Sequence, residues 1–421
     1  MKRKSVPWLV VFFLMASNLY ACGPDLLVAS TTTPYPDFHA NNPMVHQVGR
    51  TIVGVDGKSL RLRGVNLGGW LLWEGWDFSK GFDLTENTID ESLADLASQP
   101  AVDSFHEKMY ANFIAEADIK AIADAGFNSV RLPINYRILE DDNNPYVYKD
   151  SGWALIDQLL DWCEKYGVYV ILDLHAVPGG QSAMPPSNTN ITEARLWSSP
   201  EYRSRTIALW KAIASRYKDR EIVAGYDLLN EPLLANGEKL VSFYQQLIAS
   251  IREVDPYHMV ILEGTEYSGN FSMFSGPLSQ NQVYGFHMYN WVIDNRQMML
   301  DELKTVSQDH GVPLWAGEFG DNTYEMIATT VDMFEDPANE VNAGWSFWTW
   351  KKVPGYYPAL IAVSVPSRFQ AVFDWINDPI TNPKPSAAEA QAGMDDFIQA
   401  ARYENTQLDP QMIQALTGSW R

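Results

Sequence analysis

Apolar runs alternate with amphipathic segments along most of the chain. Eight short runs are almost continuously apolar, which is typical of strands that are buried on both faces of a parallel sheet. They lie at 60–66, 128–133, 168–175, 222–230, 258–264, 282–289, 312–319 and 341–350. Segments with helical periodicity separate most of them, and these lie at 112–126, 154–167, 204–217, 239–254, 300–311, 326–336 and 386–402.

This order of elements predicts an α/β protein built as a (β/α)8 TIM barrel over residues 46–403. A Val-Asp-Gly turn within 48–60 predicts a short β-hairpin before the first barrel strand. The segment 73–105 is a long insertion after that strand, and we expect it to cover one end of the barrel. A doubly wound sheet is the alternative, although no G-x-G-x-x-G motif follows the first strand.

The first 22 residues have the pattern of an export signal. Three basic residues at 2–4 precede an apolar run at 6–15, which is too short to cross a bilayer as a helix. The signal ends in "LYAC" at 19–22, which resembles a bacterial lipobox with Cys22 as the acylated residue. We therefore expect a lipid-anchored protein of the bacterial cell envelope, which touches the membrane only through this anchor. Ordinary signal cleavage, giving a secreted or periplasmic protein, is the alternative.

Composition limits the classes of partner. The 421 residues are 46% hydrophobic and 20% charged, as in a globular protein. A net charge of −21 argues against nucleic acid, whose phosphates would be repelled. Residues 23–45 are rich in Thr, Pro and Asn and predict a tether, while 404–421 is expected to form a C-terminal tail. Cys163 lies in an amphipathic segment and is expected to be a small buried hydrophobe.

Polar side chains follow the predicted strands where each strand ends. Because the carboxyl ends of barrel strands converge on one site, we expect these residues to meet. They are Asn66, Glu74, Arg131, His175, Asn230, Glu231, His287, Tyr289, Glu318 and Trp348. Two carboxylates from different strands suit glycosidic bond cleavage, which needs one protonated acid and one ionised carboxylate. Arg131 and Tyr289 are expected to keep one of them ionised.

Aromatic residues gather near the same strand ends. Sugar rings present C–H faces that pack on aromatic planes, so this enrichment favours a saccharide cleft, although about half of these rings are expected only to fill space. They are Trp70, Trp73, Trp76, Trp291, Trp348 and Trp350.

Other polar residues are assigned plainer roles. His175 and His287 could form a metal pair, but no third ligand is convincing, so we expect them to bind substrate and expect no metal or cofactor. His258 begins a strand at the opposite end and is expected to be structural, and Lys351 and Lys352 are expected to be solvated.

The strand-end motifs resemble those of glycoside hydrolase family 5, a group of retaining barrel glycosidases. The matching motifs, between about residues 61 and 352, are "SVRLP", "LDLH", "LNEP", "FHMY", "AGEFG" and "GWSFWTWK". The resemblance implies that Glu231 is the acid/base and Glu318 the nucleophile. It also implies that Asn230 binds the sugar 2-hydroxyl and that the remaining strand-end residues support the site.

Longer segments bear on the substrate, expected to be a β-glucan polysaccharide or oligosaccharide. "RGVNLGGWLLWE" and "DLHAVPGGQ" are similar to the exo-β-1,3-glucanase branch, in which a Glu at the position of Glu74 binds the terminal glucose. The segment 112–136 resembles bacterial endoglucanases that cleave β-1,4 or mixed-linkage glucans. Glu74 favours exo action. A non-catalytic carbohydrate-binding lipoprotein and a transglycosylase are the remaining alternatives.

Overall fold

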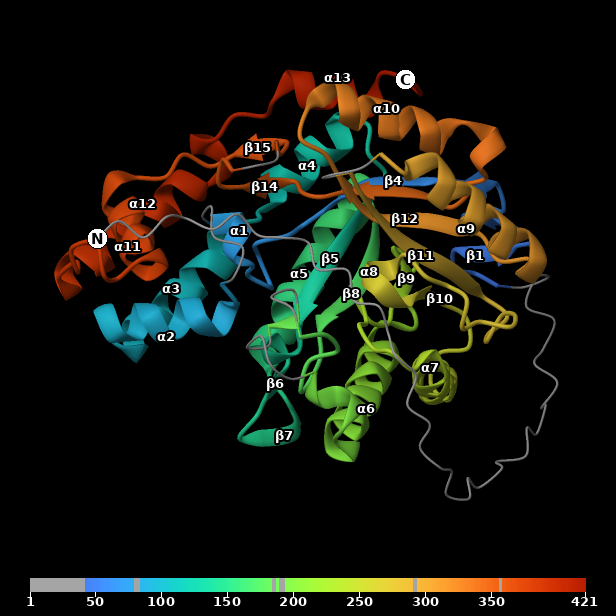
Figure 1. Cartoon of the computed structure of the whole chain (residues 1–421), viewed down its shortest axis with the longest axis horizontal. Helices are drawn as coiled ribbons and strands as arrows, with labels where there is room; N and C mark the ends of the chain where they lie inside the picture. The colour runs from blue at the N-terminus through green and yellow to red at the C-terminus, as the bar shows by residue number, and fades with distance from the viewer. Residues whose placement is uncertain (1–41, 79–83, 184–186, 189–193, 291–293, 356–357) are drawn as a thin grey trace, which may run out of the picture. The chain divides into compact units, whose positions relative to one another are not determined.

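The computed structural model describes residues 42–78, 84–183, 187–188, 194–290, 294–355 and 358–421 (Figure 1). Eight parallel strands close into a barrel in the order in which they occur along the chain. They are β4 (Leu62–Asn66), β5 (Ser129–Asn135), β8 (Tyr169–Ala176), β9 (Val223–Asp227), β10 (Met259–Glu263), β11 (Gln282–Tyr289), β12 (Leu314–Gly320) and β13 (Gly344–Phe347). The predicted TIM barrel is confirmed.

Helices surround the strands, as the sequence pattern predicted (Figure 1). Two of them end where a glycine adopts the left-handed conformation that favours this residue, Gly167 at φ 68° and Gly311 at φ 69°. The helices between barrel strands are α4 (Glu116–Asp124), α5 (Asp150–Tyr166), α6 (Pro200–Tyr217), α7 (Gly237–Arg252), α8 (Thr265–Ser268), α9 (Arg296–His310) and α10 (Tyr324–Glu335).

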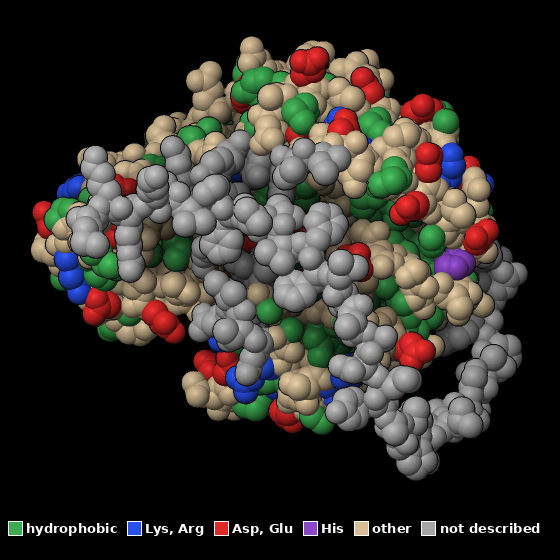
Figure 2. Space-filling view, in the orientation of Figure 1, with side chains coloured by type: hydrophobic (Ala, Val, Ile, Leu, Met, Phe, Trp, Pro, Cys, Tyr) green, Lys and Arg blue, Asp and Glu red, His purple; other side chains and the backbone are tan. Residues whose placement is uncertain are grey.

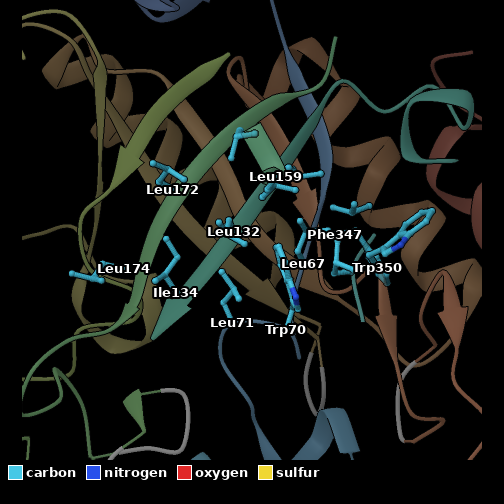
Figure 3. Close-up of a cluster of buried hydrophobic side chains, with 14 of the residues drawn as sticks. Leu67, Trp70, Leu71, Leu132, Ile134, Leu159, Leu172, Leu174, Phe347 and Trp350 are labelled. Atoms are coloured by element: carbon cyan, nitrogen blue, oxygen red, sulfur yellow. The ribbon is translucent and has the colours of Figure 1, made fainter. Parts of the chain in front are cut away.

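Alternation along the strands divides apolar from polar side chains. In Figure 3, Leu132 and Ile134 of β5 lie beside Leu172 and Leu174 of β8, in the hydrophobic layer between barrel and helices. Successive strand residues point to opposite faces, so Arg131, next to Leu132, and Asp173, between Leu172 and Leu174, point into the barrel, where they pair with each other. The strands thus deliver charged groups to the barrel axis while their other face supports the fold.

A small antiparallel sheet seals the amino ends of the barrel strands. It consists of β1 (His46–Val48), β2 (Thr51–Val53) and β3 (Ser59–Leu60), one strand more than the predicted hairpin. Val45 and Ile52 pack on apolar residues inside the barrel, among them Leu62, Ile171, Met259, Val283 and Trp315. The opposite, carboxyl ends of the strands are left to form the site.

The insertion after β4 mostly does not cover the barrel. It contains α1 (Gly75–Phe78), α2 (Glu86–Leu96) and α3 (Gln99–Asn112), and Figure 1 shows α2 and α3 beside α11 (Ser367–Asn377) and α12 (Ala387–Ala401). Rings of Phe105, Phe369 and Phe397 join these helices through apolar contacts, which explains why the segment packs at the side. Among the described residues of the insertion, those at its beginning reach the site.

The C-terminal segment packs on the barrel rather than forming a tail. Residues 404–421 include α13 (Pro410–Thr417), which lies against α10 and buries Met412 and Leu416. Trp420 packs on Trp345 of β13 and under the guanidinium of Arg63. Burial of these apolar groups contributes favourably to the free energy of folding, and a segment exposed to solvent would lack this contribution.

Charged side chains are scattered over the face shown in Figure 2, and they form no continuous basic patch among the coloured residues. Within the described part of the chain, no helix has the length and apolar character needed to cross a membrane. Shorter elements complete the structure: β6 (Glu140–Asp141) with β7 (Asn144–Tyr148), and β14 (Lys351–Lys352) with β15 (Ile361–Ala362).

Candidate active site

The carboxyl ends of the barrel strands bring the predicted polar residues together. Hydrogen bonds, ion pairs and one ring contact link them into a single network. Its members are Asn66, Glu74, Arg131, His175, Asn230, Glu231, His287, Tyr289, Glu318 and Trp348. Most of these side chains are buried, so the charges among them act in a poorly screened environment.

Glu231 follows β9 at a turn of unusual geometry. Its φ of 42° is left-handed, and its backbone N–H donates to Oε2 of Glu263 at 2.6 Å. Its side-chain Oε1 lies 2.8 Å from Nδ1 of His287. Burial raises the pKa of Glu231, and the nearby negative charge of Glu318 adds to this, although His287 opposes the shift. The carboxyl group is therefore biased toward its protonated form.

Glu318 lies near the end of β12 in a more cationic setting. Nη1 of Arg131 donates to its Oε1 at 2.6 Å, and the hydroxyl of Tyr289 donates to its Oε2 at 2.8 Å. Burial alone would raise the pKa of Glu318, but His287 and Arg131 outweigh it and the pKa is lowered. Glu318 is thus biased toward the ionised form, the reverse of Glu231.

The two carboxylates lie close to each other, with His287 between them. One oxygen of Glu231, one oxygen of Glu318 and a ring nitrogen of His287 are all within 4.8 Å of one another. Carboxyl groups about 5 Å apart are typical of retaining glycosidases, whereas inverting enzymes separate them by roughly 6.5–9.5 Å to admit a water molecule. The spacing therefore favours direct attack by one carboxylate on the substrate.

Arg131 forms the base of the site and is fully buried. Besides Glu318 it pairs with three further carboxylates, at distances of 2.9 to 3.1 Å, which are Asp173, Asp227 and Glu263. Buried charges are tolerated only when they are paired and hydrogen-bonded, and here one guanidinium forms ion pairs with several carboxylates. Burial and the charge of Glu263 raise the pKa of Asp227 well above its ordinary value, which relieves the excess of negative charge.

Amide side chains complete the contacts of Arg131 and orient the neighbouring histidine. Asn230 Oδ1 accepts from Arg131 at 2.8 Å, and its Nδ2 lies 3.0 Å from Nε2 of His175. Nδ1 of His175 is 2.6 Å from Asp173, so the ring accepts from Asn230 and donates to Asp173. Asn66 also reaches Arg131, with Oδ1 3.2 Å from Nη1.

Glu74 enters the site from the start of the insertion and is buried. Its Oε1 lies 3.9 Å from Nε2 of His175, and its Oε2 accepts from the indole N–H of Trp76. Burial raises the pKa of Glu74 well above its usual range, with help from the charges of Asp77 and Glu318. The carboxyl group of Glu74 is therefore biased toward its protonated form.

The two lysines after β13 are buried, so the expectation that they are solvated is wrong. Nζ of Lys351 binds Asp118 at 2.8 Å and the carbonyl of Phe113 at 2.6 Å. Lys352 lies in the electrostatic environment of Asp77, whose pKa burial raises to about 7 although Lys352 lowers it. Each lysine thus neutralises a carboxylate on a segment remote in sequence.

The aromatic residues divide between the site and the core. Trp348 stacks on His175, with ring centroids 5.6 Å apart, and Gly68 leaves room for it because a Cβ there would lie 2.8 Å from the Trp348 ring. Trp70, Trp73 and Trp350 are at most 1% exposed and fill space in the core. Trp291 lies outside the described residues.

Sequence comparison identifies the family. The model of the cellulase family, glycosyl hydrolase family 5, matches residues 90–353. The chain belongs to glycosyl hydrolase family 5. This family 5 chain is therefore a glycosidase, and the retaining arrangement of its carboxylates is typical of the family.

Three relatives show the range of named activities around this family 5 glycosidase. A beta-xylosidase of Phanerodontia chrysosporium is 30% identical over 359 residues, covering 77% of this chain and 74% of the relative. A probable glucan 1,3-beta-glucosidase A of Aspergillus niger is 25% identical, covering 72% of this chain and 86% of that protein. Endoglucanase C of Acetivibrio thermocellus is 33% identical over 189 residues, but the match spans only 44% of this chain and 53% of the endoglucanase.

Several residues of the network were not predicted. Glu263 ends β10 and carries the same signal as the predicted residues, a polar group where an apolar run stops. Asp173 and Asp227 lie within or at the end of strands, where a charge in an apolar run marks the barrel interior. Gln181 donates to the backbone carbonyls of His175 and Asn230, which no pattern in the sequence indicates.

Proposed function

We propose that this glycosidase hydrolyses β-glucans with retention and that it releases glucose from the ends of β-1,3-linked chains. The observation that carries the reaction type is the pair Glu231 and Glu318, close together and with pKa values shifted in opposite directions. The pair supplies the two protonation states that the reaction needs without a metal or cofactor in any step.

In the first step Glu318 attacks the anomeric carbon while Glu231 protonates the leaving glycosidic oxygen. Arg131 and the Tyr289 hydroxyl keep the nucleophile ionised and fix its direction. Glu231 is then a carboxylate and takes a proton from water, whose oxygen attacks the glycosyl-enzyme and frees Glu318. The ring of His287 lies 2.8 Å from Glu231 and 3.5 Å from Glu318, so it can interact with whichever of the two carboxylates is negatively charged at each step.

The residues beside the pair are suited to hold the sugar. Asn230 is oriented by Arg131 and His175 and can bind the 2-hydroxyl, a contact that strengthens in the transition state. Trp348 offers an aromatic face next to His175. Asn66 is fixed by Arg131 and by Ser346, with its Nδ2 3.1 Å from the serine hydroxyl, and so supports the base of the site.

Exo action is supported by Glu74. It is buried beside His175 and fixed by Trp76, and as a protonated acid it can donate to a sugar hydroxyl as well as accept. A buried polar group of this kind is suited to bind the hydroxyls of a terminal sugar. The glucan 1,3-beta-glucosidase, which aligns over most of its length, agrees with this choice, whereas endo-β-1,4-glucanase action rests on a match to half of a relative.

Product analysis tests the proposal. The protein lacking residues 1–22 would be incubated with β-1,3- and β-1,4-linked gluco-oligosaccharides and with aryl β-glucoside and β-xyloside. We expect glucose alone from the β-1,3 series, and β-configured product at early times. Mixed oligosaccharides from the β-1,4 series would instead identify an endoglucanase, and preference for the xyloside would identify a xylosidase. Products longer than the substrate would reveal transglycosylation. Absence of any cleavage would favour the alternative of a non-catalytic carbohydrate-binding protein.

We also propose that the protein is exported and held at the bacterial cell envelope by a lipid on Cys22. The support is the signal-like pattern of residues 1–22. These residues lie outside the described part of the structure.

A further inference from the structure

Glu263 is a buried carboxylate at the end of β10 to which the proposed mechanism gives no role. Its Oε2 accepts the backbone N–H of Glu231 at 2.6 Å and the hydroxyl of Ser268. Its Oε1 lies 3.1 Å from Nη2 of Arg131 and 3.2 Å from Nε2 of His287. One carboxylate therefore contacts the backbone of Glu231 and the side chain of His287, which lies against both catalytic glutamates. It also contacts Arg131, which binds Glu318.

The contact with the Glu231 backbone fixes an unfavourable conformation. A non-glycine residue at φ 42° costs free energy unless its surroundings hold it there. An N–H bonded to a charged carboxylate is among the stronger protein hydrogen bonds, so Glu263 is suited to hold this turn. This backbone conformation determines the direction in which the Glu231 carboxyl group points.

The contact with His287 reaches Glu231 a second time, through its side chain. Glu263 faces Nε2, and Glu231 faces Nδ1 at 2.8 Å. Nε2 has no aligned hydrogen-bond acceptor among the described residues, so Glu263 acts on the ring chiefly as a charge. Burial would lower the pKa of His287, but Glu263 and Glu318 raise it well above its usual value.

We propose that Glu263 is a positioning residue for the acid/base Glu231, which it holds through the Glu231 backbone and through His287. The inference rests on the proposed function. Asp173 and Asp227 pair with Arg131 as Glu263 does, but among the described contacts neither has a hydrogen bond to Glu231. Glu263 thus shares the neutralisation of Arg131 with Asp173 and Asp227, but among these three carboxylates the described hydrogen bond to Glu231 is made by Glu263.

The leaving group of the substrate separates positioning from general stability. Protonation by Glu231 is needed for a poor leaving group, such as a sugar, and hardly for dinitrophenol. Because a general acid contributes about 10²–10⁴-fold, we expect Glu263→Gln to lower kcat/KM at least about tenfold more for a gluco-oligosaccharide than for dinitrophenyl β-glucoside. Equal losses on the two substrates would overturn the proposal.

A matched control lies at the other end of the barrel. Asp255 is also a buried carboxylate, bonded to a histidine, His258, and to the hydroxyl of Tyr226. Asp255→Asn removes a comparable group remote from the site, and we expect it to reduce stability while leaving the ratio of the two kcat/KM values unchanged. If Glu263→Gln does not fold, Ser268→Ala, which removes one hydrogen bond to Oε2, replaces it, with a smaller loss in the same direction expected.

A second measurement needs no substrate. Nitrogen NMR of the histidine rings would follow the titration of His287, which faces Glu231, Glu263 and Glu318 and lies within electrostatic range of Asp227. Loss of the Glu263 charge should lower the pKa of His287, and an unchanged titration in Glu263→Gln would contradict the link. If no glycoside is cleaved, the proposed function fails, yet this titration still decides whether Glu263 acts on His287.

Discussion

The hydroxyl of Tyr289 should control the lower limit of the pH range over which the enzyme works. It donates to Oε2 of Glu318 at 2.8 Å, and the other oxygen of that carboxylate is held by Arg131. Tyr289→Phe removes only the first of these bonds. Because the bond favours the ionised carboxylate, its loss should raise the pKa of Glu318 from its lowered value.

The size of the effect follows from the strength of such bonds. A hydrogen bond to a charged group contributes about 1.5–3 kcal/mol, and a pKa unit corresponds to about 1.4 kcal/mol. The acidic limb of the pH profile of kcat/KM reports the free nucleophile, so it should move upward by about 1–2 pH units. The alkaline limb, which reports Glu231, should move much less.

The assay is hydrolysis of an aryl β-glucoside over a pH series, with Tyr226→Phe as the control. Tyr226 is a buried tyrosine bonded to Asp255 at the other end of the barrel, so its removal tests for a general loss of stability. An acidic limb that stays in place in Tyr289→Phe would refute the reasoning, because Glu318 would then owe its ionised state to other groups alone.

Four further predictions concern other residues. Glu74→Ala should open the end of the cleft, so that products longer than glucose become detectable by chromatography; glucose alone would contradict the assigned role. Glu231→Gln should raise the melting temperature at pH 7 by about 2 °C, because a raised pKa means that ionisation opposes folding, and the gain should vanish at low pH. Lys351→Met should cost about 3–5 kcal/mol in urea unfolding, since the buried Asp118 loses the cation that neutralises it; a loss below 1 kcal/mol would argue against the pair. Cys22→Ala should abolish labelling by radioactive palmitate and release the protein from membranes, and unchanged fractionation would argue for another anchor.

The fold and the strand-end residues could be predicted because both depend on short-range pattern. A parallel strand covered on both sides is apolar throughout, and a polar group where it stops marks the open end of the barrel. Glu231 and Glu318 followed from this rule together with the recognisable motifs around them. Glu263 satisfies the same rule, and only the absence of a family motif around it kept it off the predicted set.

The remaining features depend on contacts between distant segments. Lys351 is buried because Asp118, on a helix from the first half of the chain, meets it. The segment 404–421 packs because its few apolar residues find α10 and β13, whereas by itself it has no strong pattern. Sequence periodicity describes one element at a time, so it cannot say which partner a buried charge or a short helix will meet.

The small sheet at the amino ends of the strands also determines how the molecule is presented. Val45 packs on the apolar residues inside the amino-terminal end of the barrel. The side chain of Asn42 donates a hydrogen bond to the carbonyl of Tyr257, near the start of β10. Whatever precedes residue 42 is therefore joined to the end of the barrel that faces away from Glu231 and Glu318. A fusion partner or resin joined directly before residue 42 would therefore be attached at the closed end of the barrel, and the catalytic carboxylates lie at the other end.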